Sequence, residues 1–465
     1  MQIPIITGIY SNSTEFRTAY PRNMIPVVKD LGVSKGYLRL ADGIVETGVG
    51  PGLSRGGIRW NDKCYRVMGQ TLCSIDSKGI CTKHGTILGD DDVRFDYSFD
   101  RLAIQCSEHL YYFNGSGLTE VTSSLLGNII DFVWVDGYFL FTDGTSLVVT
   151  ELNNPYSISP FKYGSSEADP DNIIAILKLR NEIYALNRYT IEVFQNVGGN
   201  IFPFQRVAGA FIQRGCIGTR ACAVFQENLA WMGSGKNEAT SIYVGNNGQS
   251  AKIATREIDQ LLSTYSDAQL SKTKMEVRIV DSQELLYVRL PDRTLVYDHS
   301  AAKFVSEPVW FELGSGLTGS SQYRAKDFVY CYNEWLCADT ISPRYGKLTN
   351  ETGNHWSEMV GWEFSTQILY NECHGAIIHS LELVAMTGST ACGTDPQIST
   401  SYSLDGKQWS RPQFRSVGRI GEPLKRLNWL RQGQFRHMRI QKFVGTSDSR
   451  IVVARLEALV EPLYV

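Results

Sequence analysis

Long apolar runs are absent from this sequence, and so is any strong excess of charge. No apolar stretch in the chain approaches the length of about 18 residues that a membrane-spanning helix requires. The opening residues, MQIPIITGIYSNSTEF, contain no basic segment followed by a long apolar core, so we expect no secretory signal. The formal net charge of −3 gives no general attraction to nucleic acid or to an anionic membrane. These absences predict a cytosol-made protein without a membrane span.

Paired cysteine motifs are also lacking, although the chain has ten cysteines. No two of them form a CxxC pair, and most lie in apolar, strand-like runs such as YCYNEWLCAD. A reduced cysteine in such a run acts as a small buried hydrophobe. We therefore predict free thiols at the ten positions, which are Cys64, Cys73, Cys81, Cys106, Cys216, Cys222, Cys331, Cys337, Cys373 and Cys392.

Familiar cofactor-binding motifs are missing as well. Among the seven histidines only His374 and His379 cluster, near Cys373, and no HExxH or CxxC motif accompanies them. The glycine-rich stretches GVGPG and GSGLTGSS lack the lysine of a phosphate-binding loop, and no helical pattern follows them. We therefore predict neither a metal site nor a cofactor.

Carboxylates cluster in two places, DPDN (169–172) and GDDDVRFD (89–96). Paired carboxylates are the groups that glycosidases use for acid–base and nucleophilic catalysis. Acidic loops between strands have the same composition and are far commoner. We interpret both stretches as such loops and predict that the protein is not an enzyme.

The residues that are abundant favour β structure. Aromatic residues make up 11% of the chain, and 42 glycines separate its short apolar runs. From about Ser54 onward these runs form units of roughly 30–45 residues without a strict sequence repeat, which is typical of a β-propeller. We predict an all-β fold with about six or seven propeller blades over residues 54–353, preceded by an N-terminal arm and the first propeller strands in residues 1–53. A single large β-sandwich is the alternative.

One stretch, QELLYVRLPDRTLVYD (Gln283–Asp298), predicts a hairpin with strands over 285–290 and 294–297. Apolar side chains fall on both faces of its first strand, whereas a half-exposed strand alternates apolar and polar residues. The hairpin is therefore expected inside a blade, with neighbouring blades covering both of its faces. Just before it, residues 255–272 have apolar residues at helical spacing, with Thr255 and Ser266 as N-cap candidates. We expect a helical insertion there, near residues 255–270.

After about residue 354 the strands become longer, as in SLELVAMTGST and SRIVVARLEALV, and we predict a C-terminal β-sandwich over residues 354–465. It contains SLDGKQW (Ser403–Trp409), in which Asp405-Gly406 forms a tight turn over which Trp409 can fold. Similar hairpins occur in carbohydrate-binding jelly rolls and in sialidase propellers. A carbohydrate-binding or carbohydrate-processing propeller with a sugar-binding sandwich is therefore an alternative function.

Several segments resemble the packaged-DNA stabilisation proteins of short-tailed phages, also called tail hub or nozzle proteins. The resemblance covers roughly residues 20–345 and includes YPRNMIPV, SKGYLRLADGI, GLSRGGIRWNDKCYRVMGQTL, YTIEVFQN and FIQRGCIG. The resemblance is densest around the predicted hairpin at 283–298 and the helical insertion before it. Its matching positions are Ile258, Tyr265, Met275, Glu276, Asp281, Ser282, Glu284, Leu285, Leu286, Leu295, Val296, Tyr297 and Asp298.

The resemblance implies a structural protein of the virion, without catalytic residues. Such a subunit would form a homo-hexamer below the portal and its adaptor ring. It would close the conduit after packaging, carry the tail needle and the fibres or tailspikes, and pass double-stranded DNA on ejection without reading its sequence. The location would be the phage tail, after synthesis in the bacterial cytoplasm. A cellular propeller scaffold of no viral origin is a further alternative.

The densest positive run in the chain lies between residues 425 and 442. It is a candidate contact for DNA in the channel or for the adaptor, although a solvated strand face is the commoner role of such a run. We expect at most one or two of its side chains to face the channel, because several rings of phosphate contacts would hold the genome rather than let it slide. The residues are Lys425, Arg426, Arg431, Arg436, Arg439 and Lys442.

Overall fold

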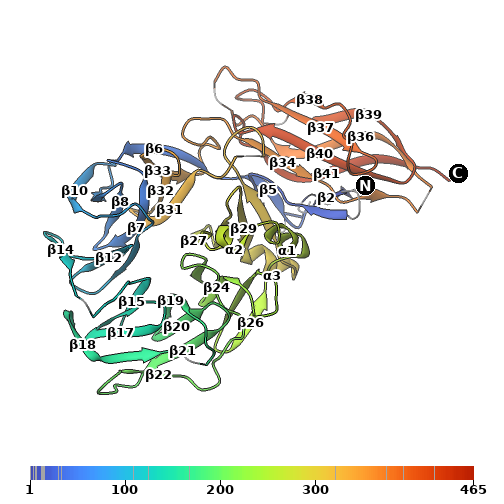
Figure 1. Cartoon of the computed structure of the whole chain (residues 1–465). Helices are drawn as coiled ribbons and strands as arrows, with labels where there is room; N and C mark the ends of the chain where they lie inside the picture. The colour runs from blue at the N-terminus through green and yellow to red at the C-terminus, as the bar shows by residue number, and fades with distance from the viewer. Residues whose placement is uncertain are drawn as a thin grey trace.

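The computed structural model describes every residue except 1, 4, 6, 7, 12–15, 30, 33, 108, 124, 167, 320, 373, 391, 424 and 465. Its strands form a ring of blades with a second all-β body beside it, and both chain ends lie in that second body (Figure 1). The helices among the described residues are short. None of them has the length and apolar character needed to cross a membrane.

Within the described chain, seven four-stranded antiparallel sheets form the blades of the propeller. The first four blades follow the chain directly. They are β7 (Ser54–Trp60), β8 (Lys63–Met68), β9 (Thr71–Ile75) and β10 (Cys81–Thr86); β11 (Arg94–Tyr97), β12 (Leu102–Cys106), β13 (His109–Phe113) and β14 (Leu118–Val121); β15 (Asp131–Val135), β16 (Tyr138–Thr142), β17 (Ser146–Glu151) and β18 (Asn154–Ser165); and β19 (Ile173–Leu179), β20 (Glu182–Asn187), β21 (Ile191–Asn196) and β22 (Phe204–Arg206).

The last three blades include one strand from the N-terminal part of the chain. They are β23 (Cys222–Phe225), β24 (Asn228–Gly233), β25 (Ser241–Asn246) and β26 (Gln249–Lys252); β27 (Lys274–Val280), β28 (Gln283–Arg289), β29 (Thr294–Asp298) and β30 (Trp310–Leu313); and β31 (Ala325–Cys331), β32 (Glu334–Asp339), β33 (Arg344–Thr349) and β6 (Gly43–Val49).

The ring is closed in two ways. The first strands of successive blades contact one another around the axis, and β31 of the seventh blade contacts β7 of the first. In addition, β6 pairs antiparallel with β33, so the N-terminal segment supplies the outermost strand of the seventh blade. This pairing joins segments about 300 positions apart in sequence. The entropic cost of closing such a loop grows only slowly with its length.

The propeller core lies between the blades. Each of its buried apolar clusters contains residues of neighbouring blades; one cluster spans the first and second blades and another spans the seventh and first. In β28, Leu286 and Val288 pack on one side with the fifth blade, while Leu285 and Tyr287 pack on the other side with the seventh. The predicted hairpin is therefore confirmed as an inner blade element covered on both faces.

Three helices interrupt the strands in the described part of the chain. The expected helical insertion is confirmed as α1 (Arg256–Leu262) and α2 (Asp267–Leu270). Ser266 caps α2 with a capping box, whereas the Thr255 side chain at the N-cap of α1 makes no capping hydrogen bond. The third helix, α3 (His299–Val305), follows β29 inside the sixth blade and was not predicted.

The second body is a β-sandwich of two antiparallel sheets. One sheet has the order β39 (Leu427–Phe435), β36 (Ala376–Met386), β41 (Val452–Pro462), β5 (Tyr37–Leu40) and β4 (Met24–Val27), with β1 (Gln2–Ile3) also on β41. The other has β34 (Gly361–Ser365), β40 (Met438–Thr446), β37 (Gln397–Ser403) and β38 (Gln413–Ser416), with β35 (Leu369–Tyr370) on β40. A separate hairpin consists of β2 (Gly8–Ser11) and β3 (Phe16–Ala19).

The all-β fold class, with a propeller and a C-terminal sandwich, is confirmed, and the single large sandwich is wrong. The N-terminal segment divides between the two bodies, because β1, β4 and β5 extend a sheet of the sandwich while β6 joins the propeller (Figure 1). The sandwich core contains Leu38 and Leu40 of β5 together with Trp362, Trp429 and Phe443.

Candidate functional site

The propeller and the sandwich are joined by a short backbone bridge. Arg22 exchanges backbone hydrogen bonds with Glu363 of β34, at 2.9 and 3.1 Å, and the next residue, Asn23, donates its backbone N–H to Glu312 of β30 at 2.9 Å. One dipeptide is therefore bonded to a sandwich strand on one side and to the sixth propeller blade on the other. Buried backbone groups satisfied in this way hold the two bodies in a defined position.

The Asn23 side chain strengthens this bridge. Its amide donates to the carbonyl of Gly361 at 2.7 Å, and its carbonyl accepts from the backbone N–H of Gly314 at 2.9 Å. The backbone of Asn23 is left-handed, with φ 55, a conformation that asparagine tolerates better than most residues. These contacts define the structural role of the segment YPRN, which is part of the family resemblance.

The hairpin residues Asp281, Glu284, Leu285, Leu286, Tyr297 and Asp298 all lie in the sixth blade. Asp281 occupies the turn between β27 and β28 with φ 49, and Glu284 contacts Gln226 of the fifth blade. Asp298 caps α3 by accepting from the backbone N–H of Ala301 at 2.9 Å, and burial raises the pKa of its carboxyl to about 6. These residues hold the blade together.

A groove of about 800 Å³ lies between the two bodies and collects several features that are separate in the sequence. It is lined by the β3 hairpin, by α1, by the hairpin residue Arg293, by the SLDGKQW turn and by Lys442. The Lys442 ammonium lies 4.3 Å from the centre of the Trp409 ring, a cation–π contact that covers this indole.

The acidic side chains in the groove all have partners. Glu257 accepts from the Thr18 hydroxyl at 3.1 Å, Glu312 pairs with Arg293 at 3.5 Å, and Glu363 pairs with Arg22 at 3.6 Å. Burial raises the pKa of the Glu312 carboxyl, although Arg293 and Arg22 act against this rise. The groove is therefore a polar crevice whose carboxylates are paired with neighbouring side chains.

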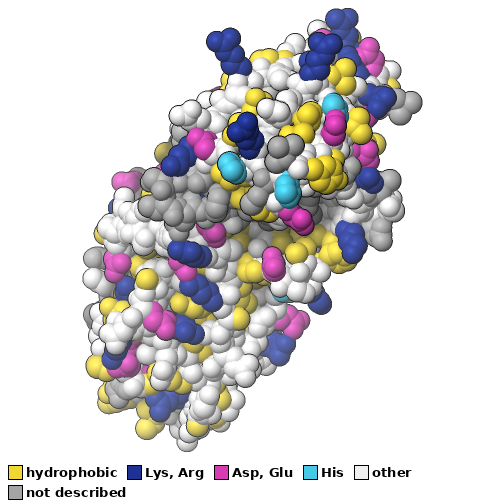
Figure 2. All heavy atoms as spheres, turned by 90° about the vertical axis from the view of Figure 1, so that its right-hand side faces the viewer, with side chains coloured by type: hydrophobic (Ala, Val, Ile, Leu, Met, Phe, Trp, Pro, Cys, Tyr) yellow, Lys and Arg dark blue, Asp and Glu magenta, His cyan; other side chains and the backbone are white. Residues whose placement is uncertain are grey.

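The basic segment does not form one surface. Lys425 pairs with Glu422 at 3.3 Å, and Arg426 pairs with Glu382. Arg431 and Arg436 are exposed on the sandwich, and Lys442 lies in the groove. On the face shown in Figure 2, basic, acidic and apolar side chains are interspersed over the sandwich.

Arg439 differs from the other five basic residues because it is fully buried. Its guanidinium donates to the backbone carbonyl of Gln432 at 2.5 Å and to the Gln441 side chain at 3.0 Å, and it lies 4.0 Å from the centre of the Tyr402 ring. Burial lowers the pKa of Arg439 to about 10. This side chain supports the sandwich interior and does not reach a surface.

Five of the six aspartates in the two acidic stretches have structural partners. Asp96 and Asp171 accept backbone N–H groups of neighbouring segments, while Asp91, Asp92 and Asp169 contact side chains. The partners are Trp134 at 2.6 Å for Asp96, Tyr189 at 2.7 Å for Asp171, Ser107 at 2.9 Å for Asp91, Lys274 at 3.6 Å for Asp92 and Lys236 at 2.5 Å for Asp169.

The histidine cluster offers little to a metal ion. His379 pairs with Glu461 at 2.7 Å, and His374 is exposed. No group of three potential ligands occurs in the part of the chain that the structure describes, and Cys373 lies outside it. The nine cysteines within the described residues are free thiols.

The SLDGKQW turn is held by its aspartate. The Asp405 carboxylate accepts from the backbone N–H groups of Lys407 and Gln408 at 2.8 Å each and from the Ser403 hydroxyl at 2.9 Å. These hydrogen bonds, first of all the one from Gln408, lower the pKa of Asp405. With its carboxylate engaged in the turn, the motif builds a hairpin, and the half-buried Trp409 lines the groove beside Lys442.

Sequence reasoning missed two features of the molecule. The Asn23 bridge had a signal in YPRN, but the partners of that segment lie about 290 and 340 positions away in sequence. An aromatic group of exposed Tyr97 and Phe99 with half-buried Trp134 was also missed, because a single Phe in a polar turn carries no periodic pattern.

Two family models together match almost the whole chain. The model described as Bacteriophage P22 Gp10, beta-propeller, matches residues 1–353, and the model described as Bacteriophage P22 Gp10, beta-sandwich, matches residues 361–461. The chain is therefore a two-domain phage protein of propeller-and-sandwich type. It belongs to the family of Bacteriophage P22 Gp10, as the resemblance in its sequence had indicated.

One curated relative agrees with this assignment. The chain is 26% identical over 460 residues to the tail hub protein gp10 of Salmonella phage P22, covering 94% of each chain. Among solved structures it is similar to the N-terminal domain of Nup159, at 8% identity and TM-score 0.42, over 66% of this chain and 95% of that one. The Pan2 WD40 domain of Neurospora crassa is similar at 9% identity and TM-score 0.42, over 70% of this chain and 98% of that one.

Proposed function

We propose that this protein is a structural tail hub, or nozzle, of a short-tailed phage. The observation that carries the proposal is the match to a tail hub protein over 94% of both chains, spanning the propeller, the sandwich and the bridge between them. In the virion, six copies would form a ring below the portal and its adaptor. The ring would close the conduit on packaged DNA, anchor the needle and the fibres or tailspikes, and open for ejection.

The physical features of the subunit suit such a role. A closed ring of identical subunits uses one contact repeated about an axis, which requires two different faces on a rigid body. The Arg22–Asn23 bridge supplies that rigidity by bonding β30 to β34. The outermost strand β18 leaves Phe161 and Tyr163 exposed, at 75% and 62% of their surfaces, and such aromatic edges are typical of protein contacts.

The chemistry of the described residues favours a structural role over an enzymatic one. The clustered carboxylates are engaged in hydrogen bonds and ion pairs, and the thiols are free and mostly buried. Free buried thiols agree with synthesis in the reducing bacterial cytoplasm before assembly into the tail. DNA would pass the ring without sequence readout, because contacts to its phosphates carry no sequence information.

Electron microscopy of the virion tests this proposal. The expected result is six copies of this chain below the adaptor, with needle and fibre or tailspike proteins attached to them. A particle lacking the chain is expected to lose its packaged DNA. Any other rotational order at this position, or retention of DNA in its absence, would contradict the proposal.

Two other functions are less well supported. A sugar-binding sandwich rests on the single SLDGKQW turn, whose Trp409 already contacts the Lys442 ammonium. Carbohydrate processing would appear as specific turnover in a glycan screen with the purified chain. A cellular scaffold would have no portal or terminase genes beside its own, and gene order decides this directly.

A further inference from the structure

Two hollows lie side by side on one face of the propeller, at the turns between the first and second strands of the first four blades. The larger measures about 540 Å³ and the smaller about 390 Å³, and both are lined by Phe99 and Trp134. Because the first strands surround the ring axis, these turns lie around one mouth of the propeller. Volumes of this size are typical of sites for small ligands.

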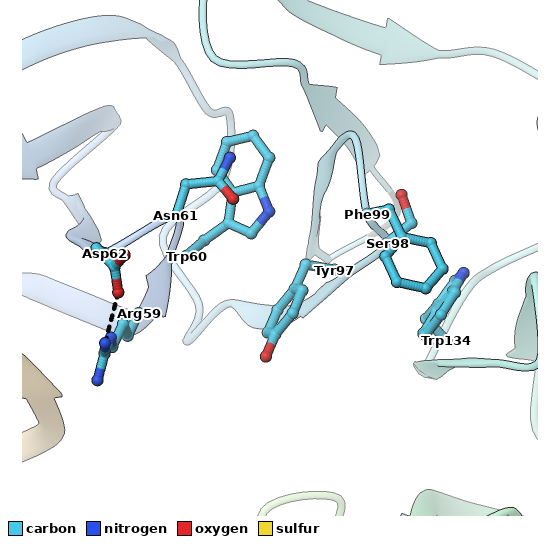
Figure 3. A pocket seen from close by; sticks show the side chains of 8 residues that line it. All are labelled: Arg59, Trp60, Asn61, Asp62, Tyr97, Ser98, Phe99 and Trp134. Carbon is cyan, nitrogen blue, oxygen red and sulfur yellow. Dashed lines mark hydrogen bonds and ion pairs between the residues drawn. The ribbon is translucent and has the colours of Figure 1, made fainter.

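The wall between the hollows is aromatic and exposed. Phe99 is 88% exposed at the tip of the β11–β12 turn, and Tyr97 is 45% exposed beside it (Figure 3). The Phe99 ring meets Trp134 edge to face, with 5.3 Å between centroids and 83° between planes. Covering a Phe side chain contributes about 1.5–3 kcal/mol, so an exposed cluster of this kind favours a ligand that covers it.

The rims of the hollows are polar and close to neutral. In the larger hollow Arg59 pairs with Asp62 at 2.5 Å, next to Asn61. In the smaller one Arg180 pairs with Glu227 at 2.6 Å, beside residues that include Lys178 and Asp136 of opposite charge. A phosphate-rich ligand needs cations without acidic partners, so this charge balance disfavours nucleic acid.

A buried indole lies behind the larger hollow. Trp60 forms part of the wall of the larger hollow, is 3% exposed, and has an indole N–H without an acceptor among the described residues. A buried donor without an acceptor costs about 1–3 kcal/mol. That N–H is buried, so a ligand in the hollow would meet the exposed aromatic rings and the polar rim instead.

We propose that this mouth of the propeller binds an uncharged oligosaccharide. One sugar ring would lay its C–H face on Phe99, and its hydroxyls would exchange hydrogen bonds with Asn61 and Asp62. The next sugar would reach Asn181 in the smaller hollow. Hydroxyl groups both donate and accept, which matches a rim of amides, carboxylates and guanidinium groups. The site is distinct from the SLDGKQW hairpin and does not depend on the tail-hub role.

The test uses the purified full-length chain and a panel of uncharged tetrasaccharides built from glucose, galactose, mannose or rhamnose. Binding is measured by saturation-transfer NMR and by calorimetry, with a heparin tetrasaccharide as the charged comparison. At least one neutral tetrasaccharide is expected to bind, and Phe99→Ala is expected to weaken its affinity by about tenfold. Phe161→Ala is the matched control, since Phe161 is similarly exposed but lies on the outer strand β18.

Three results would overturn the proposal: no neutral tetrasaccharide binds, Phe99→Ala binds as tightly as the parent chain, or heparin binds better than every neutral sugar. If no sugar binds and Phe99→Ala instead impairs ring assembly, the aromatic wall is a protein contact. Because sugar binding is measured on the isolated chain, its failure leaves the tail-hub proposal intact.

Discussion

The guanidinium of Arg278 donates to the carboxylate of Asp42 at 2.6 Å, across 236 positions of sequence. Both side chains are buried, and Arg39 contacts the same carboxylate at 2.7 Å. Burial alone would raise the pKa of Asp42, but the two arginines lower it below its ordinary value. This cluster joins the N-terminal segment before β6 to the first strand of the sixth blade, next to the strand pairing that closes the ring.

The first prediction concerns this buried pair. Asp42→Asn leaves Arg278 charged and buried without its counter-ion, so the free energy of unfolding should fall by about 3–5 kcal/mol. Urea unfolding followed by tryptophan fluorescence measures the change. Arg426→Ala is the control, because the Arg426–Glu382 pair is largely exposed and should contribute about 0–1 kcal/mol. An Asp42→Asn protein as stable as the parent would show that the pair does not hold the closure.

The second prediction concerns the hairpin of the sixth blade. Leu286 is fully buried between blades, so Leu286→Asp places a charge in a dry layer and should prevent soluble expression. Leu430→Asp is the matched control, since Leu430 is 60% exposed on the sandwich, and this variant should remain soluble. Soluble yield and melting temperature are measured for both. Normal melting of Leu286→Asp would mean that β28 is not an inner strand.

The third prediction is a pH dependence caused by His355. Burial, aided by nearby Arg324, lowers the pKa of this imidazole from its ordinary value of 6.5 to about 3, and its Nδ1 lies 2.8 Å from the Ser315 hydroxyl. Between these two pH values the unfolded chain binds a proton that the folded chain does not. Stability should therefore fall as the pH drops from 6.5 toward 3, by up to about 5 kcal/mol.

The variant His355→Gln should flatten this part of the stability–pH profile, measured by urea unfolding at several pH values. His379→Gln should leave the profile unchanged, because His379 is half exposed and paired with Glu461 at the surface. Equal slopes for the parent chain and His355→Gln would rule out the assignment.

The fourth prediction concerns the basic segment in the assembled ring. At most one or two of its six side chains should face the channel, and Arg439 should not be among them because it is fully buried. Each phosphate contact steepens the salt dependence of binding, and 6–10 contacts already cost about 10³–10⁵ in affinity between 50 and 200 mM salt. A ring structure with resolved side chains checks this. A channel lined by three or more rings of these residues would refute it.

Much of the propeller was predictable because the strands that pair within a blade are short and are neighbours in sequence. Hairpin turns such as Asp136-Gly137 fix pairing between strands that are neighbours in sequence, and the apolar run in β28 marked its burial on both faces. Helix α3 was not predicted because it spans only His299–Val305 and packs Ala301 and Ala302, small residues that leave little helical periodicity. Its cap, Asp298, had been noted only as a position that matches the family, directly after the strand predicted at 294–297.

The sequence alone determined the fold class, the free thiols and the burial of the central hairpin, because each depends on composition or on spacing within one unit. Only the tertiary structure decided the partners of distant segments: β6 in the seventh blade, β4 and β5 in the sandwich, and Asn23 between the two bodies. It also separated the basic residues, since the alternation of β40 turns Arg439 inward and leaves Lys442 in the groove. Pairing between strands distant in sequence depends on the surfaces that meet after folding, and local propensity does not encode those surfaces.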